Sequence, residues 1–393
     1  MNEAIRCFEK HFGTAPACTT RAPGRVELLG NHTDYNQGLV MALAVDKYIT
    51  MAAAPRDDDQ VELVSTAFDA PARFTVGHIE RDPEATWANY TKGLLLQLQQ
   101  RGVRTGGFNA AIHSTVPLGG GLSSSAALLV ASALTVRKLH PYTLAADGTA
   151  TPAQGHAPPL TDPERLALAK ACQAAENQFV GVNCGLLDHI SSLFGKAHQV
   201  VRIDCLHLTV DWAPLPADLA VVVCHSGVRH ALVGGEYNER RSMCEAAAAK
   251  LGVAALRFVN PPGLEAARAR LSPREYECAV HIVGENDRVQ RGARALAVND
   301  LATFGGFLFD SHASSRDSFK NSCPELDILV ELARVEPACL GARLTGGGFG
   351  GATLNLVQAD QAETFRASVG RAYESRTGHP LESWVCDVVD GAA

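Results

Sequence analysis

The most informative segment of the chain is Val116-Pro117-Leu118-Gly119-Gly120-Gly121-Leu122-Ser123-Ser124-Ser125-Ala126-Ala127. Its three consecutive glycines expose backbone N–H groups because no Cβ covers them, and its three serines add hydroxyl groups. The apolar residues that follow predict a buried helix. A glycine loop that leads into a helix N-terminus favours anion binding, since unpaired N–H groups and the helix dipole both face the ligand. A turn without a ligand is the alternative, but the preceding proline, the serines and the immediate helix favour a phosphate site.

Other nucleotide-binding patterns do not fit this chain. Neither Gly-Lys-Ser nor Gly-Lys-Thr occurs, which excludes the common phosphate loop, and the His-Arg-Asp and Asp-Phe-Gly signatures of protein kinases are also missing. The cluster Gly346-Gly347-Gly348-Phe349-Gly350-Gly351 matches the dinucleotide pattern. That pattern should open a helix, whereas Ala352–Val357 predicts a strand. We therefore reject a nicotinamide site.

The chain of 393 residues exceeds one ordinary core, so we expect two domains. Helix and strand signals alternate throughout, and we place the domain change near residue 210, which gives domains 1–210 and 211–393. Residues 141–163 are rich in Pro, Gly, Thr and Ala and predict an exposed, mobile loop. The helix after this loop begins with a capping box of Thr161 and Glu164.

Composition limits the partners and the compartment. A net charge of −7 gives no electrostatic basis for binding nucleic acid or an anionic membrane. No run reaches the roughly 18 apolar residues of a membrane helix, and the first residues lack the apolar core of a signal peptide. The 11 cysteines are scattered without a Cys-x-x-Cys pair, which is typical of reduced thiols. We expect a cytoplasmic enzyme, with a monomer favoured.

The first polar constellation is Arg21-Ala22-Pro23-Gly24-Arg25-Val26-Glu27-Leu28-Leu29-Gly30-Asn31-His32-Thr33-Asp34-Tyr35. Two arginines bracket a Pro-Gly turn, and Asn31, His32 and Asp34 place donors and acceptors in one short loop. Such a group suits a ligand with several hydroxyls. A capped turn with satisfied polar groups is the alternative.

The second constellation is Gly181-Val182-Asn183-Cys184-Gly185-Leu186-Leu187-Asp188-His189-Ile190. The apolar residues mark one face of a short helix and leave Asp188 free to point elsewhere. Asp188 is then either a carboxylate that accepts a proton from an alcohol or simple compensation of the helix dipole. Glu176, at the edge of the preceding helix's apolar stripe, is a solvated flank on spacing alone. A third segment, Arg229-His230-Ala231-Leu232 through Tyr237, is otherwise an ordinary polar loop.

Together these segments resemble the galactokinase branch of the small-molecule kinase superfamily named after galactokinase, homoserine, mevalonate and phosphomevalonate kinases (GHMP kinases). The resemblance covers nearly the whole chain. It rests on ordered motifs: Arg25–Tyr35, residues 117–127, Leu344–Gly351, Trp87–Gly93, residues 181–195, Val228–Tyr237 and Ser322–Asp327.

The resemblance implies a fold of two α+β domains with the active site in the cleft between them. It implies ATP-dependent phosphorylation of the anomeric hydroxyl of galactose to galactose 1-phosphate. Asp188 then aligns with the catalytic aspartate, with Arg25 beside it. The remaining implied roles are ATP phosphates at residues Gly119–Ser125, Mg²⁺ on Ser125 and Glu176, the sugar at Asn31, His32, Thr33, Asp34, Gly185, Asp188 and Tyr237, and adenine at Trp87 and Tyr90.

One residue departs from the family pattern, because Asn31 replaces the usual glutamate before His32-Thr33-Asp34. An asparagine can bond a C6 hydroxyl but does not repel a C6 carboxylate. We therefore expect looser discrimination at C6, which Asn31→Glu should sharpen. A 1-kinase for a related sugar such as galacturonate is one alternative. A non-catalytic sugar and ATP sensor is the other, opposed by the intact Arg25, Ser125, Glu176 and Asp188.

Overall fold

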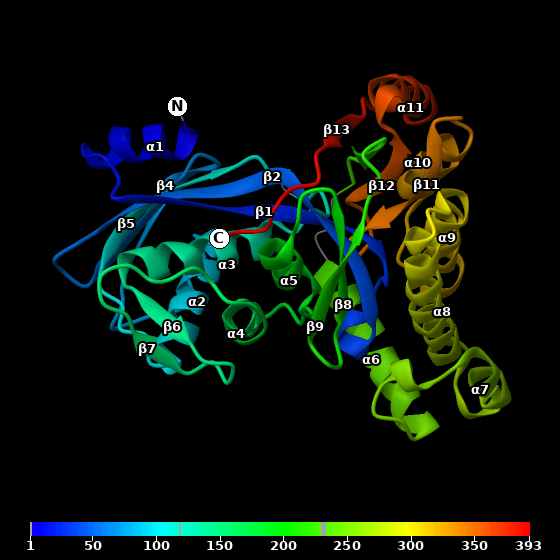
Figure 1. The fold of residues 1–393 in the computed structure, drawn as a ribbon, viewed down its shortest axis with the longest axis horizontal. Helices are drawn as coiled ribbons and strands as arrows, with labels where there is room; N and C mark the ends of the chain where they lie inside the picture. Colours follow the sequence, from blue (N-terminus) through cyan, green and yellow to red (C-terminus); the bar gives the residue numbers. More distant parts are fainter. Residues whose placement is uncertain (1, 118, 229–232) are drawn as a thin grey trace.

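The computed structural model describes residues 2–117, 119–228 and 233–393. Figure 1 shows two sheets with helices packed around them, the first built by the N-terminal half and the second by the C-terminal half. The expected α+β class is confirmed.

The first sheet has seven strands in the order β4-β3-β5-β2-β8-β9, and β1 also pairs with β2. All its pairs are antiparallel except β3 with β5. Long strand β2 serves three neighbours because β5 pairs with its C-terminal half and β8 with its first residues. The strands are β1 (Cys18–Leu29), β2 (Leu39–Pro55), β3 (Gln60–Ser65), β4 (Phe68–Thr75), β5 (Phe108–Ser114), β8 (Gln199–Asp204) and β9 (Thr209–Pro214).

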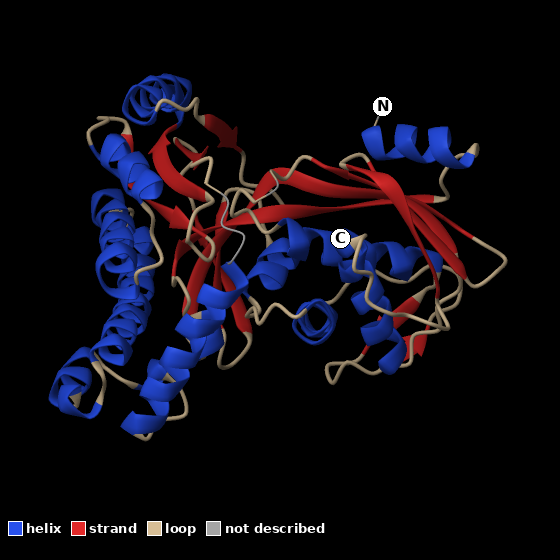
Figure 2. Ribbon diagram, turned by 180° about the vertical axis from the view of Figure 1, so that it is seen from behind, coloured by secondary structure: helices blue, strands red, loops and turns tan. Residues whose placement is uncertain are grey.

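Helices cover both faces of this sheet, as Figures 1 and 2 show. On one face Ala4 and Phe8 of α1 pack against Ala52 and Ala111 of the strands in a small separate core. The other face carries the main core, in which the nearly all-apolar α3 packs on β1 and β2. The helices are α1 (Glu3–Phe12), α2 (Asn89–Gln100), α3 (Ser124–Leu139), α4 (Asp162–Ala174) and α5 (Leu187–Phe194).

The second sheet is antiparallel throughout, in the order β11-β12-β10-β13. Alternate residues of β10 face two different cores, since Val221 and Val223 join the main core while Val222 and Cys224 pack with α10 and α11. Its elements are β10 (Leu219–His225), β11 (Cys339–Thr345), β12 (Ala352–Gln358), β13 (Glu382–Cys386), α9 (Leu301–Ser314), α10 (Pro324–Arg334) and α11 (Ala362–Thr377).

A helical group beside this sheet has its own apolar cluster, to which α6, α7 and α8 contribute Cys244, Leu264 and Ile282. Its helices are α6 (Val233–Leu251), α7 (Pro261–Ala266) and the long α8 (Pro273–Ala297). The short helical turns of the chain are η1 (Asp34–Asn36), η2 (Thr86–Ala88), η3 (Ala175–Val180), η4 (Leu256–Phe258), η5 (Arg268–Arg270), η6 (Ser315–Phe319) and η7 (Ala359–Gln361), of which η3 and η6 are π-helical.

The passage from one sheet to the other lies between the end of β9 at Pro214 and the start of β10 at Leu219. The main core nevertheless continues from the first sheet into the second, and the C-terminal residues return to the first half, where Gly391 N donates to Gly195 O at 2.8 Å. A division at residues 1–210 and 211–393 would cut β9, so we propose a boundary a few residues later.

Two sequence expectations on local structure have different outcomes. The capping box of Thr161 and Glu164 is confirmed at the start of α4. The expectation that residues 141–163 form only an exposed loop is wrong, because β6 (Tyr142–Leu144) and β7 (Ala150–Pro152) make a small hairpin. Tyr142 and Leu144 are buried under it, which gives the segment an apolar anchor that its composition hides.

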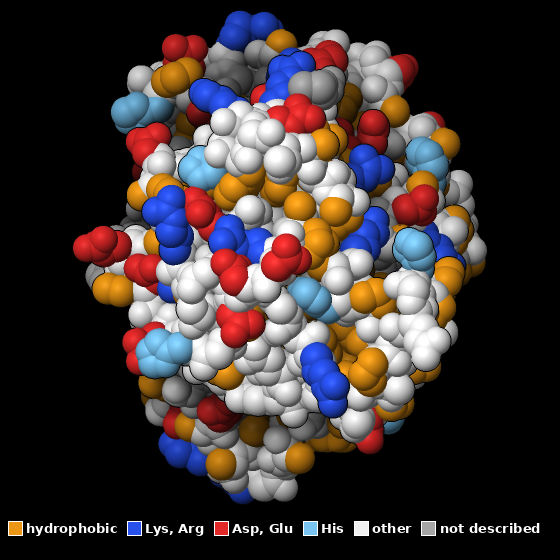
Figure 3. Space-filling view, turned by 90° about the vertical axis from the view of Figure 1, so that its left-hand side faces the viewer, with side chains coloured by type: hydrophobic (Ala, Val, Ile, Leu, Met, Phe, Trp, Pro, Cys, Tyr) orange, Lys and Arg blue, Asp and Glu red, His pale blue; other side chains and the backbone are white. Residues whose placement is uncertain are grey.

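The charged side chains on the visible face agree with the moderate net charge of −7. On the face in Figure 3 the positive and negative side chains are interspersed, and neither sign forms a continuous patch. Among the described residues, no helix is both long and apolar enough to span a bilayer.

Candidate active site

A cavity of about 380 Å³ opens where the two halves meet. It brings together most of the residues that the sequence analysis singled out, although they lie far apart in the chain. Its described lining includes Arg25, Asn31, His32, Asp34, Gly119, Gly120, Gly121, Leu122, Ser123, Ser124, Ser125, Glu176, Gly185, Asp188 and Tyr237.

Asp188 is the centre of an ionic group in this cavity. Its Oδ1 accepts from Arg25 Nε at 2.7 Å and lies 2.6 Å from Arg25 Nη2, and its Oδ2 accepts from Ser123 Oγ. Arg25 Nη1 also donates to Gly121 O at 2.6 Å. Burial alone raises the pKa of Asp188, but the Arg25 guanidinium and the Ser123 hydroxyl outweigh burial and lower it. Asp188 is therefore a fixed, ionised carboxylate.

The contact to Ser123 refines the role expected for the serines. Ser123 lies just before α3 with φ of +54°, and its side chain does not cap the helix but binds Asp188. Ser124 and Ser125 form the first turn of α3, whose N-terminus faces the cavity. A helix N-terminus beside a glycine loop favours a bound phosphate.

The two glycine clusters of the chain meet behind this loop. Gly121 has φ of +70°, and a Cβ there would lie 2.7 Å from Thr345 O at the end of β11. Gly346 lies opposite, where a Cβ would be 3.1 Å from Gly121 O. The second cluster thus lets the C-terminal half close on the phosphate loop, a structural role in place of the rejected dinucleotide site.

The polar loop after β1 presents two groups to the cavity with altered acidity. Burial lowers the pKa of His32 to about 4, and the ring is held between Tyr35 Oη at 2.8 Å and Gly347 O at 2.9 Å. Burial and the nearby Asp188 charge raise the pKa of Asp34 to about 6. A Cβ at Gly185 would overlap the Asp34 carboxylate, so only glycine allows this approach.

Two members of the expected sugar set do not present free groups to the cavity. Thr33 is fully buried and outside the lining, and its hydroxyl lies 2.7 Å from both Gly30 O and Leu39 O, where it holds the loop in shape. Asn31 lines the cavity, but its Nδ2 donates to Gly346 O at 2.8 Å and its Oδ1 accepts from Asn321 Nδ2 at 3.0 Å. The amide of Asn31 is therefore already committed to the protein.

Glu27, which the sequence did not indicate as a site residue, also lines the cavity and is only 2% exposed. Its carboxylate accepts from Asn31 Nδ2 at 3.2 and 3.3 Å and lies 3.7 Å from Arg343 Nη1. Burial raises the pKa of Glu27 to about 7, although Arg343 and Arg25 oppose the rise. Glu27 lies four residues before Asn31 in the sequence. The cavity therefore contains a carboxylate although position 31, where the family usually has glutamate, is an asparagine.

Support from α8 was also missed. Glu285 Oε2 accepts from the backbone N–H groups of Gly30 and Asn31 at 2.8 Å each, and His281 Nε2 lies 3.1 Å from Asn31 O. These contacts span about 250 positions of the chain, as the separations of 255 and 254 show. No local pattern in the sequence indicates them.

Ser125 and Glu176 both line the cavity, as a shared magnesium site requires. A hydroxyl and a carboxylate are hard oxygen donors of the kind that Mg²⁺ accepts. Glu176 is buried, which excludes the solvated flank that its spacing indicated, and it lies in the π-helical η3 that follows α4. The donor set therefore fits the implied ion.

The two aromatic residues expected at the adenine are not part of the cavity lining. Trp87 stacks on Phe68, with ring centroids 5.5 Å apart, and lines a separate surface hollow. Tyr90 is packed against the main core, and burial together with the Glu176 and Cys184 charges raises its pKa to about 12. Their role at adenine stays a prediction.

Tyr237, near the start of α6, reaches the cavity and lies against His32 with ring centroids 4.9 Å apart. The neighbouring segment Arg229-His230-Ala231-Leu232, singled out in the sequence, lies outside the described residues.

Comparisons with known proteins agree with this site. The N- and C-terminal domains of GHMP kinases match residues 89–196 and 293–375, and the galactokinase galactose-binding signature matches residues 6–55. A mevalonate kinase structure has a TM-score of 0.64 over 95% of this chain and 100% of its own, at 15% identity, a likeness in fold alone.

Closer relatives are galactokinases. The protein from Roseiflexus sp. (strain RS-1) is 41% identical over 98% of this chain and 94% of its own length, and the Homo sapiens protein is 41% identical over 100% and 96%. The crystal structure of Lactococcus lactis galactokinase complexed with galactose has a TM-score of 0.89 at 30% identity, covering 99% of this chain and 98% of that one.

The fold and the phosphate loop define a GHMP-type small-molecule kinase. Within that class the chain belongs to the galactokinase family.

Proposed function

We propose that this chain transfers the γ-phosphoryl group of ATP to the C1 hydroxyl of galactose, with Asp188 and Arg25 as the catalytic residues. Its family makes it an ATP-dependent galactose kinase. The observation that carries the assignment of roles is the Arg25–Asp188–Ser123 group beside the N-terminus of α3. An assay of turnover with ATP across a panel of hexoses tests it, and galactose should give the highest kcat/KM.

Phosphoryl transfer needs alignment and charge neutralisation more than covalent chemistry. The N–H groups of Gly119–Ser125 and the dipole of α3 bind the phosphates, and Arg25 stabilises the transferring group. Asp188 accepts a hydrogen bond from the sugar hydroxyl and fixes its direction. Because the pKa of Asp188 is lowered, it is a weak base, which favours orientation of the hydroxyl first and proton uptake as the new bond forms.

Ser125 and Glu176 would hold Mg²⁺, which neutralises phosphate charge when bound. We expect Ser125→Ala and Glu176→Gln each to raise the Mg²⁺ concentration for half-maximal rate by about tenfold, since each variant loses one oxygen ligand or its charge. A magnesium titration at saturating sugar measures this. Ser124→Ala, one residue earlier, is the matched control and should leave the Mg²⁺ concentration for half-maximal rate unchanged. Unchanged curves for both Ser125→Ala and Glu176→Gln contradict the assignment.

We assign the sugar to the part of the cavity lined by His32, Asp34, Gly185 and Tyr237, with Glu27 and Asn31 also in the lining. Because the amide of Asn31 is committed, we assign the reading of the sugar's far hydroxyl to Glu27. This removes the basis for a galacturonate kinase, since a carboxylate still faces the pocket. It also replaces Asn31→Glu as a test, because a second carboxylate there would lie against Glu27. The sensor alternative has no support in this site, where the ionic group and the metal donors are complete.

Glu27→Gln should therefore weaken the enzyme's discrimination between sugars that differ at C6. We expect the wild type to use galactose about ten- to hundredfold better than galacturonate or 6-deoxygalactose, the range for one hydrogen bond to a charged group. In Glu27→Gln both ratios should shrink, and the penalty on galacturonate should fall most because the repelling charge is gone. The measurement is kcat/KM for the three sugars at a pH of about 8.5, where Glu27, whose pKa is raised to about 7, is mostly ionised.

Glu275→Gln serves as the control for this experiment, because it removes another buried carboxylate, on α8, outside the cavity. It should leave both ratios as they are. If Glu27→Gln behaves like this control, Glu27 does not contact C6.

Two broader expectations remain proposals. A cytoplasmic location is supported by the free thiols of all 11 cysteines. A monomer that binds only sugar and ATP, without nucleic acid or membrane, is supported by the net charge of −7 and the interspersed surface charges. Sedimentation of the purified protein tests the oligomeric state.

A further inference from the structure

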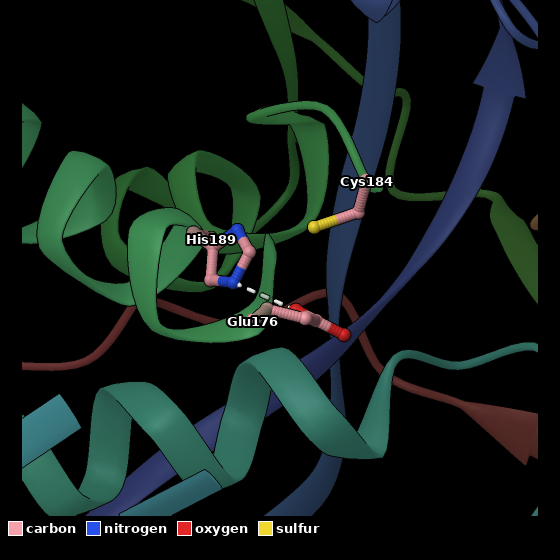
Figure 4. A group of neighbouring side chains, drawn as sticks. All are labelled: Glu176, Cys184 and His189. Atoms are coloured by element: carbon pink, nitrogen blue, oxygen red, sulfur yellow. Dashed lines mark ion pairs between the residues drawn. The ribbon is translucent and has the colours of Figure 1, made fainter. Parts of the chain in front are cut away.

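A second cluster of donor atoms shares Glu176 with the expected magnesium site and adds Cys184 and His189 (Figure 4). One donor atom from each residue lies within 4.8 Å of the other two. Glu176 comes from η3, Cys184 from the loop before α5 and His189 from α5 itself. Figure 4 shows the sulfur of Cys184 and the imidazole of His189 on the same side of the Glu176 carboxylate.

Among the described residues, His189 has a single polar contact. Its side chain is 0% exposed, Nε2 lies 3.1 Å from Glu176 Oε2 in an ion pair, and Nδ1 has no hydrogen-bond partner within the part of the chain that the structure describes. A buried imidazole normally has a partner at each nitrogen, so this ring, which faces a carboxylate and a thiol, is suited to a further ligand.

The loop that carries Cys184 is held in place. Asn177 Oδ1 accepts from both Cys184 N at 3.1 Å and Cys184 Sγ at 3.2 Å, while Gln173 Nε2 donates to Cys184 O at 3.1 Å. Glu176 and Cys184 both line the cavity, so an ion can reach the cluster from solvent. The donors are thus positioned before any ligand arrives.

We propose that Glu176, Cys184 and His189 form a binding site for one borderline-soft divalent cation of the Zn²⁺ class, and that its occupation inhibits the kinase. Sulfur and imidazole nitrogen disfavour Mg²⁺ and suit Zn²⁺, for which a site of three protein ligands with one open position is common. Tetrahedral zinc bonds place ligand atoms about 3.3–3.8 Å apart. His189 Nε2 and Glu176 Oε2 already lie 3.1 Å apart, and the donor atoms lie within 4.8 Å of one another, so Cys184 Sγ needs to move by about 1 Å at most. Metal binding displaces the proton of the Cys184 thiol, which is released to solvent.

Inhibition follows because Glu176 cannot serve two ions. A cation held by Cys184 and His189 takes the Glu176 carboxylate away from Mg²⁺ and places extra positive charge behind Asp188. This inhibitory part rests on the proposed role of Glu176 in magnesium binding. The binding part does not.

Binding is tested with Co²⁺, which occupies zinc sites and gives a near-ultraviolet charge-transfer band when bound to a thiolate. The full-length protein, kept reduced with a phosphine and free of ATP and Mg²⁺, should show this band, saturating at one Co²⁺ per chain and removed by Zn²⁺. Cys184→Ser should abolish the band. His189→Gln should weaken Co²⁺ affinity about tenfold or more, at least the loss seen when groups supporting metal ligands are removed.

The other ten cysteines require a matched control. Cys339→Ser, a half-buried thiol on β11, should leave the band unchanged, and so should Cys244→Ser on α6. A band that survives Cys184→Ser, or that disappears in either control, assigns the metal to another thiol and overturns the site. Absence of saturable Co²⁺ binding overturns it as well.

Inhibition is tested by titrating Zn²⁺ into the galactose kinase assay at two Mg²⁺ concentrations. In the wild type, tenfold more Mg²⁺ should raise the half-inhibiting Zn²⁺ concentration by about the same factor, as direct competition requires. Cys184→Ser should need about tenfold more Zn²⁺ than the wild type at either Mg²⁺ concentration. Equal inhibition of both proteins overturns the inhibitory part. If the magnesium titrations of Ser125→Ala and Glu176→Gln are unchanged while the cobalt band is present, the magnesium assignment fails and the soft-metal site stands.

Discussion

Asp188→Asn should abolish turnover while leaving ATP binding largely intact. The substitution removes the charge that orients the sugar hydroxyl and the group that takes up its proton, and the two roles together are expected to cost about 10²–10⁴-fold or more in kcat. Asp188 is the only acid between residues 181 and 195, so no neighbour in that segment can replace it. Single-turnover rates and ATP titration of the purified variant measure the two effects separately.

Ser123→Ala is the matched comparison, because it removes only one hydrogen bond to the same carboxylate. It should lower kcat by at most about ten- to hundredfold, the range for a hydrogen bond to a charged group, and less than Asp188→Asn does, because Arg25 still holds the carboxylate. Near-wild-type turnover of a folded Asp188→Asn variant contradicts the catalytic assignment.

At acidic pH, Asp188 differs in protonation from Asp34 and Glu27, two other carboxylates of the cavity. Its pKa is lowered, so Asp188 stays ionised at every pH above the ordinary aspartate value of about 3.9. Asp34 and Glu27, whose pKa values are raised to about 6 and about 7, gain protons first as the pH falls from neutral. Changes in sugar KM between pH 7 and 5 should therefore disappear in part in Glu27→Gln and remain in Ser123→Ala.

Local patterns in the sequence indicated which residues line the cavity more readily than which of them contact one another. Gly119–Ser125 and Asp188 could be found because the signals are local: a glycine loop ahead of an apolar helix, and an acid on the polar face of a short one. Their pairing through Arg25 came only from the family resemblance, since residues 25 and 188 are 163 positions apart.

The spacing of residues in the sequence could not predict which side chains are buried or which already form hydrogen bonds within the protein. Glu176 was indicated as a solvated flank because helical periodicity continues an α-helix, whereas the chain changes to π-helical geometry at Ala175 and turns the carboxylate inward. Asn31 was expected to face the sugar because it occupies the position of the glutamate that is usual in the family. Its hydrogen bonds to Gly346 and Asn321 depend on the C-terminal half folding against it.

The largest such gap concerns Glu285, which holds the sugar-binding loop from a distant helix. Glu285 is 0% exposed, accepts from Gly30 N, Asn31 N and Arg288 Nε, and lies 3.9 Å from Arg343 Nη1. Burial would raise its pKa, but Arg288 and Arg343 hold the pKa well below its usual range. The stability that this carboxylate contributes is therefore present at neutral pH and is lost as the pH falls below the ordinary glutamate value of about 4.3.

Glu285→Gln should destabilise the fold by about 3–5 kcal/mol, the cost of breaking a buried ion pair from one side. Arg343 is fully buried, and its Nε and Nη2 have no hydrogen-bond partner among the described residues, so it depends on the nearby carboxylates for compensation. Because Gly30 and Asn31 also lose a charged acceptor, the loop should loosen and the KM for galactose should rise while the KM for ATP changes little. Thermal and urea unfolding, each with and without galactose, measure the stability loss.

Glu275→Gln, ten residues earlier on α8, is the control that separates the two effects. Glu275 is also a buried carboxylate, but it closes the capping box with Ser272 and binds Lys250 at 2.7 Å, away from the cavity. Its loss should cost about 1 kcal/mol, as for a helix cap, with no change in the KM for galactose. Glu285→Gln should exceed it in both measurements, and its stability should vary less than that of the wild type on acidification. Equal stability losses in the two variants, with an unchanged KM for galactose, would show that the sugar loop does not depend on α8.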